Sequence, residues 1–279
     1  MKKSLIGEKF FIYIVAVVFL IIVLFPIFWI VISSFTPYED IFKQPISYIP
    51  ENPTINNYIE VFRELPYSRL FINSLIASSS SAIVSVLLSL FAAFAFARIN
   101  FPLKNFIFMT ILATMILPQM STVLFLFRIF KATNLLNTIY GLAILYASSF
   151  LPFTIWAFVS FINQIPKDIE EAAIIDGCSA WGVLRKIMFP LMGPAIGTFF
   201  IINFVAAWGE LLYALIFANG IASRTLSVGI VQLSGLTYYE VPWDKMSAMS
   251  MTMIVPLIML VLIFQRKIIS GLTRGAVKQ

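Results

Sequence analysis

The sequence lacks several residue types on which protein chemistry often depends. Its 279 residues include no histidine and a single cysteine, Cys178. The absence of histidine removes the commonest metal ligand and the commonest proton shuttle at neutral pH, and one cysteine excludes an internal disulfide. A phosphate-binding loop of the form G-x-x-x-x-G-K is also missing, which excludes ATP binding of that kind. We therefore expect no metal site in this chain.

Charged residues are scarce as well. Asp, Glu, Lys and Arg make up 11% of the chain, against roughly a quarter in a soluble domain. Hydrophobic residues account for 60%, and the mean hydropathy is +0.95. A helix satisfies its own backbone hydrogen bonds inside a bilayer. The composition therefore predicts an all-α integral membrane protein.

Six charge-poor stretches are long enough to cross a bilayer. They lie at residues 10–35, 70–97, 105–127, 139–161, 196–217 and 246–265. The first is too long for a signal peptide and lacks a small-residue cleavage site, so we expect a retained span. Pro26, Pro118 and Pro256 lie within expected spans, where proline favours a kink. We expect residues 1–279 to form a single transmembrane domain.

Loop charges predict the orientation. With six spans and both termini in the cytoplasm, most of the 19 Lys and Arg residues fall on the cytoplasmic side, as positively charged loops usually do. The net charge of +6 is then a topology signal and gives no reason to expect a nucleic-acid partner. This topology places one sizeable loop, residues 36–69, outside the cell.

A polar segment with helical pattern, residues 170–194, lies between the fourth and fifth expected spans. We expect a first helix over residues 167–176, ended by Gly177 in the left-handed conformation. Ser179 then caps a second helix that runs towards Met188, before Pro190 and Pro194 end it.

The first helix of this segment is about ten residues long, which makes it marginal on its own in water. Its apolar side chains are too many for one narrow buried stripe; they are Ile169, Ala172, Ala173, Ile174 and Ile175. Such a helix needs a receiving groove. The residues alone leave open whether that groove belongs to this protein or to a partner.

Several motifs carry a resemblance to a known family. The pattern Glu171-Ala172-Ala173, Asp176-Gly177 and Ile187-x-x-Pro190 resembles the EAA loop of permease subunits of ATP-binding-cassette importers. We use that name for residues 165–194. Four further segments resemble the carbohydrate-uptake permeases of the maltose and oligosaccharide type: residues 49–58, 73–102, 165–177 and 271–278.

The resemblance implies an ATP-driven importer permease that takes up a sugar, an oligosaccharide or disaccharide, by alternating access. It implies a multi-pass protein of the bacterial cytoplasmic membrane, with a cytoplasmic coupling helix between spans four and five. The implied partners are a second homologous permease, two copies of a cytoplasmic ATPase, and an extracellular or periplasmic sugar-binding protein. This chain would hold no cofactor, because the partner ATPase binds ATP and Mg. It would hold no catalytic residues either, because import of the sugar needs no covalent step.

The resemblance also implies roles for residues at matching positions. The expected ATPase-coupling residues are Glu170, Glu171, Ala172, Ala173, Asp176 and Gly177. The candidate substrate path or gate comprises Asn203, Trp208, Glu210 and Gln119. Glu210 is the acid that lies within an expected span, and intramembrane acids are often functional. Its surroundings depart from the family, which usually has Trp-Asn where this chain has Trp208-Gly209.

Two other classes of membrane protein are alternatives to an importer permease. An ion-coupled secondary transporter usually carries buried charges along its path, and this sequence has few charges in its expected spans, no histidine and no clear two-half repeat. A channel or a channel-type membrane subunit does not require an ordered cytoplasmic docking helix. Both classes remain alternatives to the importer.

Overall fold

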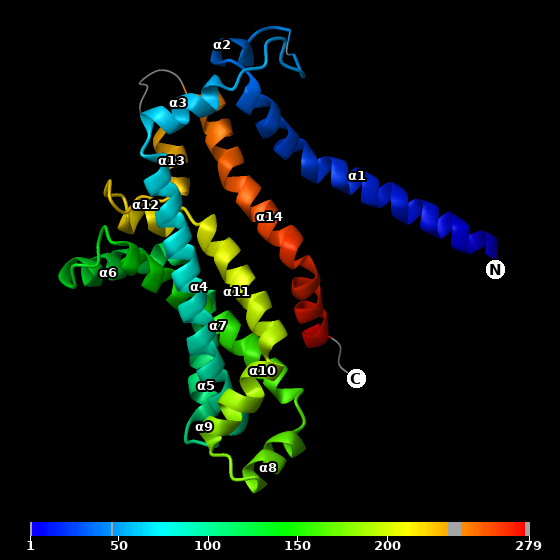
Figure 1. Ribbon diagram of the computed structural model, residues 1–279, viewed down its shortest axis with the longest axis vertical. Coiled ribbons are helices and arrows are strands. Elements are labelled where there is room, and N and C mark those ends of the chain that lie inside the picture. The colour runs from blue at the N-terminus through cyan, green and yellow to red at the C-terminus, as the bar shows by residue number, and fades with distance from the viewer. Residues whose placement is uncertain (1, 46, 234–240, 277–279) are drawn as a thin grey trace. The chain divides into compact units, whose positions relative to one another are not determined.

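The computed structural model describes residues 2–45, 47–233 and 241–276. Every regular element in these ranges is a helix (Figure 1), which confirms the expected all-α class. The elements are α1 (Lys2–Phe35), α2 (Tyr38–Ile41), α3 (Asn56–Glu64), α4 (Tyr67–Arg98), α5 (Lys104–Ala113), η1 (Thr114–Ile116), α6 (Gln119–Ala132), α7 (Ile139–Asn163), α8 (Lys167–Ile175), α9 (Ala180–Val183), η2 (Leu184–Met188), α10 (Phe189–Leu191), α11 (Gly193–Trp208), α12 (Leu212–Phe217), α13 (Leu226–Leu233) and α14 (Trp243–Ala276). The family-like segment at 271–278 ends outside the described residues.

Four described helices are long and apolar enough to cross a membrane: α1, α4, α7 and α14. Two bent pairs pass the same test together, α5–η1 with α6 at 104° and α9–α10 with α11 at 72°. The described part of the chain therefore holds four to six candidate spans, and these overlap the six stretches that the sequence predicts.

The sharper bend lies at Pro118. α5 tightens into the 3-10 turn η1, and Leu117 then takes an extended backbone conformation with φ −70° and ψ 124°. Proline disfavours helical geometry in the preceding residue and donates no backbone hydrogen bond of its own. The kink expected at Pro118 is therefore a full break, whereas Pro26 and Pro256 lie inside the continuous helices α1 and α14.

The polar segment after α8 differs from expectation at Pro190. Ser179 caps α9 as predicted, since its hydroxyl accepts the N–H of Gly182 at 3.2 Å. The chain then passes through the π-helical turn η2 into α10, which contains Pro190. The prediction that Pro190 ends this helix is wrong. Proline has no N–H to donate and its ring crowds the preceding turn. The wider π-helical turn directly before Pro190 gives the ring room, so the helix continues.

The chain divides into two compact units, and the first comprises Met1–Tyr67 and Gly229–Pro256. In it, Asn57 on α3 is buried, and its side-chain amide donates to the carbonyls of Ser34 at 3.0 Å and Thr36 at 2.9 Å. These bonds satisfy acceptors that the C-terminal end of α1 leaves unpaired. The large apolar side chains of α1 between Phe10 and Phe25 are exposed, as lipid-facing side chains are.

The second unit comprises Ser68–Val228 and Leu257–Gln279 and is built around α4, α7 and α11. One face of α4 buries small polar side chains: Ser74, Ser78, Ser81, Ser85 and Ser89. Small residues let membrane helices approach closely. At one end of this unit, α8 and η2 join the same core through Ala173 and Met188, which pack with Phe158 of α7.

The Asn57 bonds lead to a prediction about stability. Replacing Asn57 by Ala leaves two buried carbonyls without their donors, which costs about 1–3 kcal/mol. We expect a lower thermal unfolding midpoint for detergent-purified Asn57→Ala. Asn56→Ala is the matched control, because the neighbouring Asn56 is exposed. Equal midpoints for the two variants would show that these bonds contribute nothing measurable.

Candidate functional site

Helix α8 carries the central motif of the EAA loop and ends in a well-defined turn. Gly177 adopts φ +85°, the left-handed conformation that the sequence predicts. Its N–H bonds the carbonyl of Ile174 at 3.0 Å, and the N–H of Cys178 bonds the carbonyl of Ala173 at 2.9 Å. This pair of bonds is a Schellman motif, which closes the C-terminus of a helix and reverses the chain.

The face of α8 that points away from the second unit is exposed and largely apolar. Ile174 is 58% exposed and Ile175 85%. Of the six residues expected to contact an ATPase, four are also exposed: Glu171, Ala172, Asp176 and Gly177. In Figure 1 the helix lies at the end of the second unit, beyond α9 and α10. The described residues of that unit therefore leave this face uncovered, which is the geometry that a partner groove requires.

The other two expected contact residues point inward. Ala173 packs into the core of the second unit, and Glu170 is 7% exposed. Glu170 Oε1 accepts from Arg98 Nε at 2.5 Å. The structure thus assigns Glu170 an internal partner, whereas its neighbour Glu171 faces outward.

Arg98 joins three elements through a single guanidinium. It is the last residue of α4, and it pairs with Glu170 of α8. Its Nη2 also donates to the carbonyls of Ile162 and Ile165, both at 2.9 Å. These carbonyls belong to the end of α7 and the turn that follows it, where a helix leaves acceptors unpaired. Arg98 therefore fixes the start of α8 to the ends of α4 and α7.

Sequence reasoning did not single out Arg98 as a site residue. Arg98 and Glu170 are 72 residues apart in the chain, and no helical or strand periodicity relates positions at that distance. The available signal was a basic residue at the end of an apolar span, which also fits an ordinary membrane-interface charge.

Asn203 connects the long helices of the second unit. It is 2% exposed, and its amide donates to Ser85 Oγ on α4 and Thr154 Oγ1 on α7, each at 3.2 Å. Side-chain hydrogen bonds of this kind hold membrane helices together. Asn203 is a candidate for the substrate path, and the structure shows that its amide links α11 to α4 and α7 in the packed interior.

Trp208 and Glu210 also take part in packing and capping. Trp208 is 2% exposed, stacked on Phe204 with ring centroids 5.6 Å apart. The Glu210 carboxylate accepts the backbone N–H groups of Tyr213 at 2.9 Å and Ala214 at 3.1 Å. It therefore satisfies two backbone donors in the first turn of α12, the second of the two helices into which the apolar stretch at 196–217 is divided.

Gln119 is the candidate path residue that lies at a cavity. It opens α6, directly after the break at Pro118, and lines a pocket of about 370 Å³. Thr122, Ser148, Ser149 and Tyr213 contribute further polar groups to this pocket. Asn203, Trp208 and Glu210 do not line it, although Glu210 caps the helix that carries Tyr213. Of the four expected path residues, Gln119 is therefore the one that this pocket includes.

The described residues contain no cluster of three or more Asp, Glu or Cys side chains arranged to hold a metal ion. The second unit offers a set of hydroxyl and amide groups at the α5–α6 break, together with an exposed and largely apolar face on α8.

Comparison with known proteins gives consistent matches. Residues 85–274 match the family described as binding-protein-dependent transport system inner membrane component. The chain is 38% identical to the sulfoquinovosyl glycerol transport system permease protein SmoH of Agrobacterium fabrum, over 95% of this chain and 93% of the relative. It is 34% identical to the trehalose/maltose transport system permease protein MalG of Thermococcus litoralis, over 94% of each.

Solved structures show the same fold. The chain resembles a chain of a bacterial ABC transporter involved in the import of the acidic polysaccharide alginate, with a TM-score of 0.81, 19% identity, and coverage of 93% of this chain and 97% of the other. A structure of a bacterial alginate ABC transporter in complex with an alginate pentasaccharide-bound periplasmic protein matches with a TM-score of 0.65, 16% identity, and coverage of 94% and 93%.

The contacts of Arg98 generate a second prediction. Arg98→Ala leaves the Glu170 carboxylate buried without a cation and frees two carbonyls, and breaking a buried pair in this way costs about 3–5 kcal/mol. We expect α8 of the purified variant to become sensitive to limited proteolysis. Arg98→Lys restores part of the protection, because it keeps the charge but loses the forked geometry.

Arg185→Ala is the matched control, since Arg185 is an exposed arginine on the same EAA loop. It should be cleaved at the wild-type rate. Wild-type protection in Arg98→Ala would show that the ion pair does not hold α8 in place.

Proposed function

Because this chain belongs to the family of binding-protein-dependent transport system inner membrane components, we propose that it imports a sugar by alternating access, driven by ATP hydrolysis on a separate subunit. It is a multi-pass membrane protein and a transport subunit, and its relatives are permeases of sugar transport systems. Their substrates support an oligosaccharide or disaccharide here. We propose the bacterial cytoplasmic membrane as its location.

The observation that carries this proposal is the exposed, apolar face of α8 on a helix that is firmly anchored at its other face. A helix of nine residues is marginal alone, so its seating on the second unit determines its conformation. The exposed isoleucines, with Glu171 and Asp176 beside them, then offer a preformed surface to a groove. We assign that groove to a cytoplasmic ATPase, which binds ATP and Mg.

The anchored face supplies a route for motion. A force on α8 acts through Glu170 on Arg98, and from there on the ends of both α4 and α7. Asn203 links these two helices to α11 further along. A displacement of the docked helix is therefore shared by three long helices. Two ATPase copies and a second homologous permease complete the proposed assembly.

The proposed topology has six spans and both termini in the cytoplasm. It places α8 and Arg98 at the cytoplasmic surface and the segment from α2 to α3 outside. Each bent helix pair counts as one span in this arrangement. An extracellular or periplasmic sugar-binding protein would deliver its cargo on the outer side.

We place the sugar contacts of this subunit at the pocket beside the α5–α6 break. Its amide and hydroxyl groups match the hydroxyls of a sugar, and irregular backbone at membrane depth is tolerated where it lines such a cavity. Gln119 is the residue of this pocket that we propose contacts the substrate. Asn203, Trp208 and Glu210 act by holding the surrounding helices.

The proposal is tested by reconstitution. The chain, its partner permease, the ATPase and the binding protein are placed in liposomes, and radiolabelled sugar uptake is measured with and without ATP. A sugar panel is first screened against the binding protein by calorimetry. Uptake driven by an ion gradient without ATP would favour the secondary-transporter alternative and would overturn the proposal.

Reversing one charge on the docking face should uncouple the complex. Glu171→Lys changes an exposed residue whose side chain makes no hydrogen bond or ion pair with the described residues. The fold is therefore retained, while the lysine repels the proposed ATPase groove. We expect loss of the ATPase from the purified complex and a fall in uptake of at least about tenfold, which corresponds to about 1.4 kcal/mol. Glu51→Lys, the same change at an exposed site in the first unit, should leave both quantities unchanged.

Removing the Gln119 amide should weaken sugar recognition. A neutral hydrogen bond contributes about 0.5–1.5 kcal/mol, so Gln119→Ala should raise the KM for uptake about threefold to tenfold. Ser121→Ala is the control, because Ser121 lies on the same helix, is exposed, and bonds the carbonyl of Pro118 instead of lining the pocket. An unchanged KM in Gln119→Ala would remove this pocket from the substrate path.

A further inference from the structure

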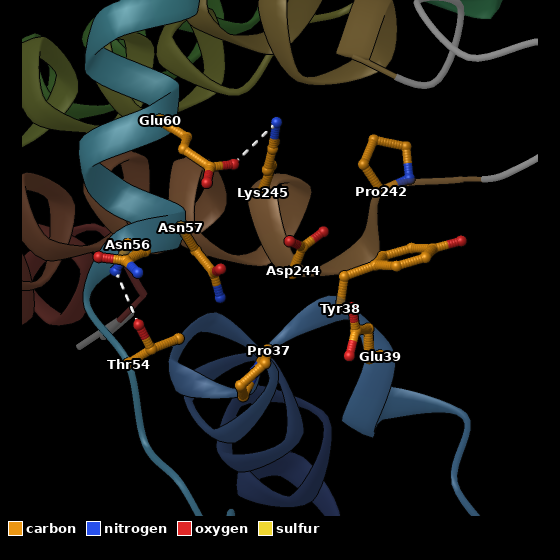
Figure 2. A pocket seen from close by; sticks show the side chains of 10 residues that line it. All are labelled: Pro37, Tyr38, Glu39, Thr54, Asn56, Asn57, Glu60, Pro242, Asp244 and Lys245. Carbon is orange, nitrogen blue, oxygen red and sulfur yellow. Dashed lines mark hydrogen bonds and ion pairs between the residues drawn. The ribbon is translucent and has the colours of Figure 1, made fainter.

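A second polar pocket lies within the first unit, where α2, α3 and the start of α14 meet (Figure 2). Its volume is about 420 Å³. The charged residues that line it are Glu39, Glu60, Asp244 and Lys245. Neither the sugar path nor the docking face of α8 includes any of them.

Asp244 is the unusual member of this lining. The residue is 4% exposed, and its Oδ1 is buried without a hydrogen-bond partner among the described residues. An ionised carboxylate can only accept hydrogen bonds, and a buried charge without a partner is costly. Figure 2 shows the carboxylate in the midst of the lining side chains, between Asn57 and Pro242. The described residues thus leave one acceptor of this pocket without a donor.

The neighbouring cation is already engaged. Lys245 Nζ lies 2.9 Å from a carboxylate oxygen of Glu60 and 2.9 Å from one of Glu64. Both glutamates lie on α3, so Lys245 joins α3 to α14. Glu39, on the opposite wall, adds a further exposed carboxylate. Acidic groups therefore outnumber basic ones in the pocket lining, and the pocket attracts positive charge.

A metal ion does not fit this arrangement, because the described residues hold no cluster of three or more metal-binding acids. An ammonium or guanidinium group at the end of a flexible stem does fit. It carries several N–H donors. Its apolar stem can lie along Tyr38 and Pro242 while the charged group reaches the Asp244 carboxylate.

We propose that this pocket receives a lysine or arginine side chain of the sugar-binding protein when that protein docks on the permease. The inference rests on the proposed function, which places the segment from α2 to α3 on the outer side. The inserted cation donates a hydrogen bond to Asp244 Oδ1, and the acidic side chains of the pocket attract its positive charge. The pocket therefore selects a partner with a protruding basic residue over one with an acidic residue at that position.

The test uses the complete complex in liposomes and varies the concentration of binding protein. Asp244→Asn keeps the shape of the side chain and removes its charge. We expect the binding-protein concentration for half-maximal stimulation of ATP hydrolysis to rise about tenfold, which corresponds to about 1.4 kcal/mol. Added salt should raise this concentration in the wild type more than in the variant.

The control is Glu51→Gln, an exposed acid of the same unit outside the pocket lining, which should match the wild type. Should Asp244→Asn fail to assemble by gel filtration, Glu39→Gln takes its place, with about a threefold rise expected because Glu39 remains partly hydrated. The partner residue is then sought by reversal: Asp244→Lys should be rescued by one Lys→Glu or Arg→Glu substitution in the binding protein.

The outcomes separate the two proposals. The pocket assignment is overturned, and the importer proposal is not, if two results occur together. The wild-type complex imports sugar, and the Asp244 and Glu39 variants need the same binding-protein concentration for half-maximal stimulation as the wild type. A wild-type complex that the binding protein does not stimulate overturns both. A raised concentration together with reversal by a charge-swapped partner establishes the pocket as a docking site.

Discussion

The buried pair between Arg98 and Glu170 is the interaction on which the position of α8 depends. One guanidinium satisfies a carboxylate of α8 and two carbonyls at the end of α7, and it is itself the terminal residue of α4. Without it, a nine-residue helix would be attached to the protein chiefly through Ala173 and its neighbours in the core. The exposed face of α8 is a usable surface only because the opposite face is held in this way.

Sequence reasoning predicted local features well because they depend on nearby residues. The bounds of α8, the left-handed turn at Gly177 and the cap at Ser179 each follow from side chains within a few positions. The inward direction of Glu170 did not, because it depends on a residue from another helix. The same reason applies to Asn203, whose partners Ser85 and Thr154 lie on two different helices. Hydropathy gave the places of the apolar stretches, but it could not show that Pro118 and Glu210 divide two of them.

The breaks in these apolar stretches share a physical requirement. Backbone groups away from water need partners, so a helix inside a membrane can stop only where side chains or a polar cavity replace its hydrogen bonds. Glu210 provides such a replacement for the start of α12, and the pocket beside Pro118 provides a polar environment for the start of α6. This need for hydrogen-bond partners at helix ends accounts in part for the polar residues Glu210 and Gln119 in apolar stretches, which the sequence suggested as substrate contacts.

The same ion pair has a consequence for how the sequence can change over time. Replacing either Arg98 or Glu170 alone leaves the other charge buried without a partner. Substitutions at this pair are therefore tolerated only when both residues change together. The exposed face of α8 carries no such internal obligation. Its residues can therefore change one at a time without disturbing the buried pair on the opposite face of the helix.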